Sequence, residues 1–144
     1  MIIEEFKNIK IAYMRRIGKY GKENKILMEN FKSFLIKNNL LNDSSIILGI
    51  ALDNPINTPD ENQRYDVGII IKDDRNINLD TRYIDDGKYA IFEIPHTTQD
   101  IDYFWNNLKS LTSNLQIDES KPILERYSTE KINLHLCEFC IPLK

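Results

Sequence analysis

The order of hydrophobic and polar residues along the chain predicts two kinds of element. Alternation, as at Ile9, Ile11 and Tyr13, is typical of a half-buried strand, whereas apolar residues spaced three and four apart mark one face of a helix. Alternation and short apolar runs predict extended segments at 9–17, 44–52, 65–71, 81–84, 88–94, 121–127 and 132–143. Helical spacing predicts a helix over 22–39 and a second one that ends near Leu111 and is capped by Thr97 or Thr98.

The predicted order of strand, helix, strand and strand occurs twice, over about residues 9–71 and 81–143. Offsets of 70 to 78 residues align Leu27 with Trp105 and Val67 with Cys137. Neither unit is long enough to bury its own core. We therefore expect one α+β domain over residues 1–144, in which tandem duplicated βαββ units form a curved antiparallel sheet with helices on one side. The opposite sheet face must then meet solvent, a partner or a ligand, and a ligand cleft is expected between the halves.

Composition narrows the class of protein without identifying a function. The chain has 144 residues, of which 42% are hydrophobic and 28% are charged, and this balance is that of a globular protein. Its net charge of -3 argues against a nucleic-acid binder, which normally carries a basic face. No apolar run approaches the roughly 18–20 residues that cross a bilayer, and the N-terminus lacks the order of a signal peptide. We expect a cytoplasmic protein that contacts neither membrane nor nucleic acid directly.

Two cysteines raise the question of redox chemistry or metal binding. Cys137 and Cys140 form a C-x-x-C motif, which can be a redox pair or half of a zinc site. A redox pair should open a helix, but this one lies in an apolar, strand-like stretch where residues three apart point to opposite faces. There is no second such motif, and His96 and His135 do not have ligand spacing. We predict two reduced structural cysteines, no metal or cofactor, and His135 as a sheet residue.

Five segments carry a resemblance to a known family. They are IAYMRRIGKY (11–20), LGIALDNPINTP (48–59), QRYDVGI (63–69), DGKYAIFE (86–93) and PILERY (122–127). In order and spacing they resemble the GyrI-like small-molecule-binding family, which includes bacterial gyrase-inhibitory proteins and the effector-binding domains of AraC-type and MerR-type transcription regulators. One departure is IPHTTQDI (94–101), which lacks the glycine turn usual before the second helix. It leaves open the shape of that rim and whether His96 lines it.

The resemblance also implies a site. Clefts in this family are lined by aromatic residues and often contain one carboxylate that contacts a cationic ligand. The match of PILERY to the family's carboxylate-containing strand assigns that carboxylate to Glu125. The aromatic candidates for ligand binding are Tyr127, Tyr65, Trp105 and Tyr20, although aromatic residues with such spacing are also common in cores. Strand alternation places Glu125 and Tyr127 on one face, and if Leu124 faces the helices, both face the cleft.

Three classes of function remain open at this point. We expect a stand-alone small-molecule-binding protein, like an effector-binding domain without its DNA-binding part, that takes amphipathic, cationic compounds such as lipophilic cations. One alternative is an interaction protein whose partner is DNA gyrase or a separate regulator. The other is a hydrolase of reactive cyclopropane-type toxins, in which Glu125 would be the general base. No Ser-His-Asp or Cys-His set stands out, so no catalytic residue is assigned beyond that alternative.

Overall fold

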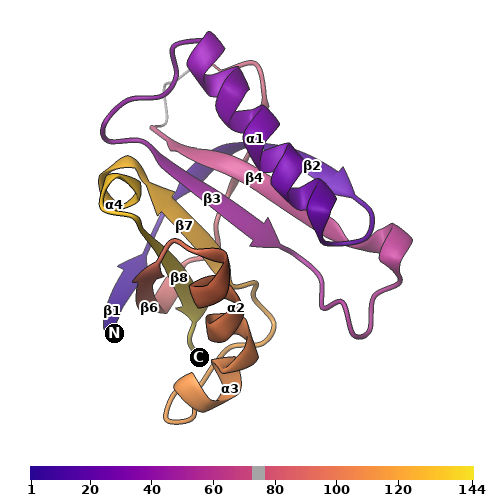
Figure 1. Ribbon diagram of the computed structural model, residues 1–144, viewed down its shortest axis with the longest axis vertical. Helices are drawn as coiled ribbons and strands as arrows, with labels where there is room; N and C mark the ends of the chain where they lie inside the picture. The colour runs from indigo at the N-terminus through magenta and orange to yellow at the C-terminus, as the bar shows by residue number, and fades with distance from the viewer. Residues whose placement is uncertain (73–76) are drawn as a thin grey trace.

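The computed structural model describes residues 1–72 and 77–144. In chain order its elements are β1 (Ile2–Phe6), β2 (Lys10–Ile17), α1 (Lys22–Lys37), β3 (Ile46–Ala51), the 3-10 helix η1 (Asp60–Asn62), β4 (Arg64–Ile71), β5 (Asp80–Tyr83), β6 (Gly87–Pro95), α2 (Thr98–Asn106), α3 (Leu108–Leu111), β7 (Leu124–Ser128), α4 (Thr129–Asn133) and β8 (Leu136–Pro142). The eight strands form an antiparallel sheet in the order β1-β6-β8-β7-β3-β4-β2-β5 (Figure 1). The α+β fold with a curved antiparallel sheet is therefore confirmed.

The two halves of the sheet meet where β3 pairs with β7, and they exchange their edge strands. β1 precedes β2 in the chain but pairs with β6, whereas β5 precedes β6 but pairs with β2. Sequence patterning did not predict β1. At the junction, Gly49 of β3 pairs with Glu125 of β7. On its other side Gly49 pairs with Val67 of β4, and on its other side Glu125 pairs with Phe139 of β8. Phe139 is thus the counterpart of Val67, two residues beyond the Cys137 that the sequence alignment suggested.

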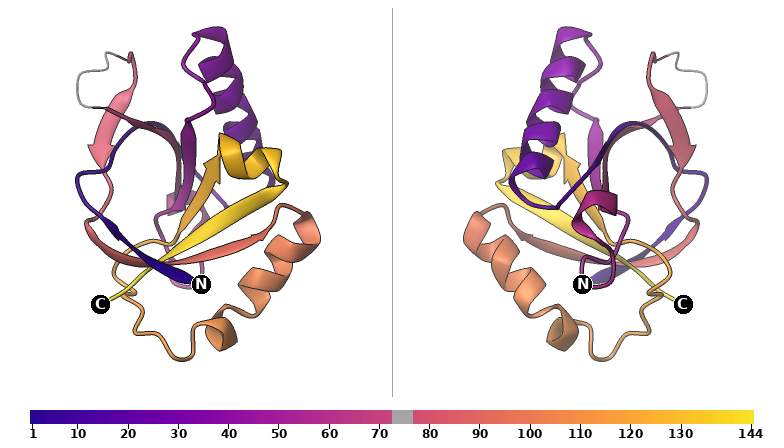
Figure 2. Two further views of the ribbon diagram at one scale, coloured as in Figure 1. Left: turned by 90° about the vertical axis from the view of Figure 1, so that its left-hand side faces the viewer. Right: turned by 90° about the vertical axis from the view of Figure 1, so that its right-hand side faces the viewer.

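Helices α1 and α2 cover the same face of the sheet (Figure 2). Phe31 of α1 packs in a cluster that includes Ile47 of β3, and Phe104 of α2 stacks on Phe139 with 4.3 Å between the ring centroids. Tyr127 borders both clusters and lies directly opposite Ile47 in the pairing of β3 with β7. Direct cross-strand partners point to the same face of a sheet. Ile47 under α1 and Tyr127 beside both clusters therefore lie on one sheet face, and this face carries both helices, as expected.

The other face of the sheet is closed by the sheet's own curl. One buried cluster joins Phe6 of β1 with Ile84, which follows β5, although β1 and β5 are the two edges of the sheet. Phe6 also stacks on Tyr89, with 4.4 Å between the ring centroids. Arg126 of β7 adds a polar tie across the curl, because it forms an ion pair with Glu4 of β1 at 3.0 Å. An apolar core therefore covers the sheet face opposite the helices. The sequence had left open whether that face meets solvent, a partner or a ligand.

The C-terminal segment holds one confirmed and one wrong prediction. Cys137 and Cys140 are free, buried and placed in separate clusters, as the opposite faces of a strand require. Burial raises the pKa of both thiols to about 12, which keeps them unreactive. His135 is not in the sheet, because it adopts a φ of 59° in the turn before β8. The cause is α4, which the sequence patterning missed and which Ser128 caps by accepting a hydrogen bond from the Lys131 amide.

Candidate functional site

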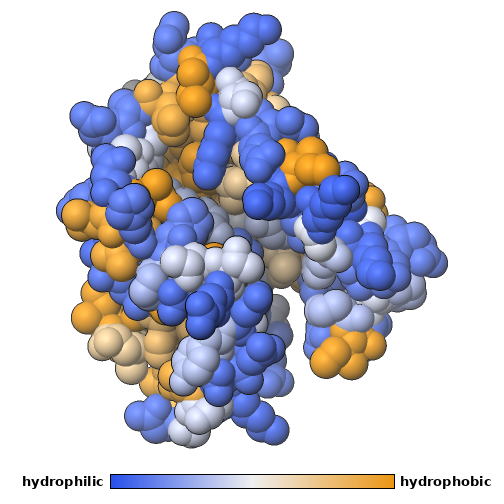
Figure 3. Space-filling view, viewed as in Figure 1, coloured by the Kyte–Doolittle hydropathy of each residue, from blue (hydrophilic) through white to orange (hydrophobic). Residues whose placement is uncertain are grey.

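A cleft of about 720 Å³ lies between α1 and the start of α2, above β4 and β7. Figure 3 views the face that carries both helices, and the surface there is indented between them and bordered largely by hydrophilic side chains. The residues expected in the site that do line this cleft are Glu125, Tyr127, Tyr65 and Trp105, and His96 joins them. The structure thus brings four of the five predicted ligand-binding residues to one place.

Glu125 lies on the floor of the cleft and retains partial exposure to it. Its Oε1 accepts a hydrogen bond from the Tyr127 hydroxyl at 2.6 Å and a longer one from the Tyr65 hydroxyl at 3.4 Å. Among the described residues, no donor reaches Oε2 and no basic side chain forms an ion pair with this carboxylate. A carboxylate removed from water without a cationic partner is costly, and a cation that enters the cleft would supply that partner.

Burial governs the protonation of this group. Removal from water raises the pKa of Glu125, and the hydrogen bonds from Tyr127 and then Tyr65 offset part of that rise. Burial also raises the pKa of both tyrosines, and the neighbouring carboxylate adds to the effect. The two hydroxyls therefore stay protonated at neutral pH and act as fixed donors that orient the Glu125 carboxylate.

Gly49 makes the room that this arrangement needs. It is the cross-strand partner of Glu125, and a Cβ at position 49 would overlap the Tyr65 hydroxyl and lie 3.2 Å from Glu125 Oε1. Gly49 is also the counterpart of Glu125 in the other half of the sheet, so one central position holds a carboxylate while its equivalent holds no side chain. Sequence reasoning missed Gly49. An isolated glycine inside an apolar strand was the available signal, because it often marks a close approach.

The orientation of β7 corrects one expectation. Alternation holds, since Glu125 and Tyr127 share a face. However, Leu124 packs into the core inside the curl and not under the helices, so Glu125 lies on the helix side of the sheet. The cleft consequently opens between the two helices, and not on the face opposite them. The physical reason is that the curled sheet buries apolar side chains on both of its faces.

The aromatic candidates have different surroundings. Trp105 combines two roles, because its ring contacts Phe139 with 5.1 Å between centroids while 41% of the residue stays exposed at the cleft. Tyr20 is not part of the lining. Its hydroxyl donates to the Arg64 carbonyl at 2.6 Å and accepts from the Asp53 amide at 3.0 Å, so it holds the connection between β3 and β4. The structure thus gives Tyr20 a supporting position beside Tyr65.

Two basic side chains approach Tyr127 from the walls. The His96 ring lies 5.5 Å from the Tyr127 ring, and Lys32 Nζ of α1 lies 5.8 Å from the centroid of the same ring. Partial removal from water lowers the pKa of His96, and the positive charge of Lys32 lowers it further. Sequence reasoning missed Lys32, although its helical spacing from Lys25 and Met28 indicates one shared face.

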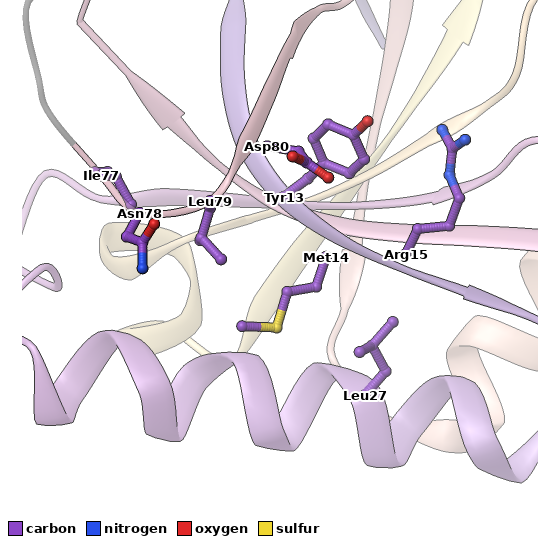
Figure 4. A pocket seen from close by; sticks show the side chains of 8 residues that line it. All are labelled: Tyr13, Met14, Arg15, Leu27, Ile77, Asn78, Leu79 and Asp80. Atoms are coloured by element: carbon purple, nitrogen blue, oxygen red, sulfur yellow. The ribbon is translucent and has the colours of Figure 1, made fainter.

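A second hollow, of about 660 Å³, lies on the other side of α1 (Figure 4). Met14 of β2, Leu27 of α1 and Leu79 converge there at the edge of the core beneath α1. Among the described residues that line it, the one basic side chain, Arg15, is already bound to the buried Asp66 at 2.6 Å. As far as residues 1–72 and 77–144 show, the hollow offers apolar surface without an uncommitted buried charge, which makes it the weaker candidate.

Over residues 1–72 and 77–144, no group of three or more His, Cys, Asp or Glu side chains is placed to hold a metal ion. The helices of this same part of the chain are all too short or too polar to cross a membrane.

Comparisons with known proteins agree with this geometry. Residues 1–144 match the sequence model of a family described as the GyrI-like small molecule binding domain. The chain is 40% identical over 146 residues to YosT of Bacillus subtilis (strain 168), a prophage-derived protein named as a candidate transcriptional regulator, covering 99% of this chain and 97% of YosT.

Solved structures share the fold. SAV2435 bound to tetraphenylphosphonium is similar with a TM-score of 0.64 and 14% identity, over 99% of this chain and 93% of SAV2435. The C-terminal domain of EcmrR is similar with a TM-score of 0.67 and 10% identity, over 99% of this chain and 96% of that domain. At these identities the likeness concerns the fold.

Proposed function

This chain belongs to the family of GyrI-like small-molecule-binding domains, and from that premise we propose that its cleft binds amphipathic organic cations. The observation that carries the proposal is the Glu125 carboxylate, which lies among aromatic side chains and has no ion-pair partner among the described residues. Such a group attracts a cation that can leave water at low cost, which means a lipophilic one.

The walls of the cleft suit a ligand of this kind. Tyr65, Tyr127 and Trp105 present ring surface, and Met28 and Ile101 add aliphatic surface. Aromatic faces attract cations, with a contribution of roughly 0.5–2 kcal/mol for each contact. A similar fold binds tetraphenylphosphonium in SAV2435, which makes this cation a reasonable first probe. The name of YosT supports an effector role, in which ligand occupancy is read by a regulatory partner.

The test is a titration of the protein with tetraphenylphosphonium, followed by the fluorescence of Trp105 and by calorimetry. We expect binding to the wild type, and a loss of roughly 2–5 kcal/mol in binding free energy for Glu125→Gln, because that change removes the anionic partner. Ligand at 100 times its Kd should add roughly 2.7 kcal/mol to stability, which raises the melting temperature by several degrees. Glu130→Gln, on the exposed side of α4, is the matched control and should bind like the wild type.

Two results would contradict the proposal. If Glu125→Gln and wild type bind the cation with equal affinity, the carboxylate is not the anchor. If neither tetraphenylphosphonium nor related aromatic cations bind at all, the cleft is not a receptor for organic cations. An interaction with DNA gyrase or a separate regulator then becomes the leading proposal for the function.

A further inference from the structure

The wall of the cleft that α1 contributes carries a net positive charge, because three lysines and one glutamate, Glu29, line it, while Asp102 lies on the opposite wall. Lys22, Lys25 and Lys32 all line the cleft, and among the described residues none of them forms an ion pair with an acidic side chain. Lys22 and Lys25 are exposed at the rim, whereas Lys32 is half-buried. The exposed Glu29 and Asp102 can offset the two exposed lysines at the rim, but in the part of the chain that the structure describes no acidic side chain pairs with the half-buried Lys32. A site for a simple cation gains nothing from this ammonium group, so Lys32 needs its own explanation.

Lys32 and Glu125 are connected through a single side chain. The Tyr127 hydroxyl donates to Glu125 Oε1 at 2.6 Å, and Lys32 Nζ lies 5.8 Å from the centroid of the Tyr127 ring. The cleft thus presents a carboxylate and an ammonium group that are both within reach of one aromatic ring. Across the cleft, partial removal from water lowers the pKa of His96, and the positive charge of Lys32 lowers it further.

This placement has a consequence for ligand choice. A ligand with only a positive charge would be attracted by Glu125 but repelled by Lys32, and Lys32 already occupies cation–π space beside Tyr127. A ligand with a second, negative group would remove that repulsion and gain a charge-assisted contact. Glu125 and Lys32 would then each have a partner.

We propose that the cleft is selective for zwitterionic amphiphiles: aromatic molecules that carry a cationic group for Glu125 and a carboxylate or phosphate group for Lys32. This inference rests on the proposed function, because it assigns the ligand class of the same cleft. Lys32 is the residue that sets the charge preference.

A matched pair of dyes tests the inference. Rhodamine 6G is an ethyl ester and a monocation, while its free acid has the same ring system and is a zwitterion at neutral pH. We expect the wild type to bind the free acid roughly tenfold more tightly than the ester, since a charge-assisted contact contributes about 1.5 kcal/mol or more. Lys32→Met should reverse this order, by weakening the free acid about tenfold and strengthening the ester severalfold. Fluorescence anisotropy of the dyes measures all four affinities.

Lys37→Met is the control variant. Lys37 lies at the end of the same helix and outside the cleft, so this change removes a charge from α1 without altering the lining and should leave both affinities unchanged. Lys32→Gln, which keeps a polar side chain, guards against a folding defect in Lys32→Met and should show the same reversal.

The possible failures are distinguishable. If the wild type binds the ester as tightly as the free acid, or if Lys32→Met and Lys37→Met change the ratio equally, the inference is overturned while cation binding in the cleft stands. If neither dye nor tetraphenylphosphonium binds to the wild type, both the inference and the proposed function are overturned.

Discussion

The buried carboxylate of Glu125 has a cost for folding. Burial raises its pKa, so between its ordinary value of 4.5 and the raised value the folded protein binds more protons than the unfolded chain. Stability contributed by this group therefore falls as the pH rises through that interval, and the whole cost is present above it. A neutral side chain at position 125 avoids this cost.

Glu125→Gln should accordingly stabilise the ligand-free protein at pH 8 by about 1 kcal/mol, which corresponds to roughly 3 °C in melting temperature. The gain should shrink as the pH is lowered and vanish near pH 4, where both states are protonated. Thermal melts from pH 4 to 8, with Glu130→Gln as the surface control, measure the difference. A melting temperature of Glu125→Gln below that of the wild type at pH 8 would contradict this account of the site.

Gly49 offers a second prediction at the scale of a residue. Gly49→Ala places a Cβ against the Tyr65 hydroxyl and beside Glu125, so either the paired strands β3 and β7 or the Tyr65 side chain must shift. We expect a loss of about 1–3 kcal/mol in the free energy of unfolding, together with weaker binding of tetraphenylphosphonium. Adding Tyr65→Phe removes the overlapping hydroxyl and should restore part of the stability. Denaturant titrations of the single and double variants measure this coupling, and strictly additive effects would refute it.

At the scale of elements, local rules predicted what they physically determine. Thr97 caps α2 as expected, since its side chain accepts a hydrogen bond from the Asp100 amide at 3.0 Å. The amphipathic spacing of α1 was likewise sufficient to predict its buried face. Alternation predicted that Glu125 and Tyr127 share a face of β7.

Alternation could not predict which face that is. The helices cover one face of the sheet, and the curl makes the other face apolar as well. An apolar residue such as Leu124 therefore does not indicate which face of β7 lies under the helices. The strand β1 was missed for a related reason. Ile2 and Ile3 are both exposed at an edge, and the segment pairs with β6, more than eighty residues away in the chain, which leaves no local periodicity to detect.

The candidate site was only partly predictable. Glu125 and its aromatic neighbours came from a family resemblance, which carries the result of long-range packing that residues alone do not reveal. Gly49 and Lys32 were missed because each acquires its role from a contact between distant elements, β3 with β7 and α1 with β7. Tyr20 was one of the aromatic candidates, but its hydroxyl is bound to the segment that connects β3 and β4, which the sequence alone does not reveal.

At the scale of the whole molecule, the exchange of edge strands ties the two halves together. β1 belongs to the beginning of the chain but completes the half that contains α2, and its Phe6 packs in the cluster that also holds Ile11 and Leu48 from the other half. The cleft lies where the two halves meet, so its shape depends on how they are held against each other. Neither half should therefore unfold independently of the other.

Phe6→Ala tests this coupling. Phe6 is 8% exposed and stacks on Tyr89, so its truncation should cost about 3 kcal/mol or more. Ile3→Ala, on the same strand but 48% exposed, should cost less than about 1 kcal/mol and serves as the control. In both variants the Trp105 fluorescence, which reports the second half, and the helical circular dichroism, to which α1 of the first half contributes about half of the helical residues, should follow one denaturant transition. If the two signals separate in Phe6→Ala, the halves fold as independent units and the strand exchange does not couple them.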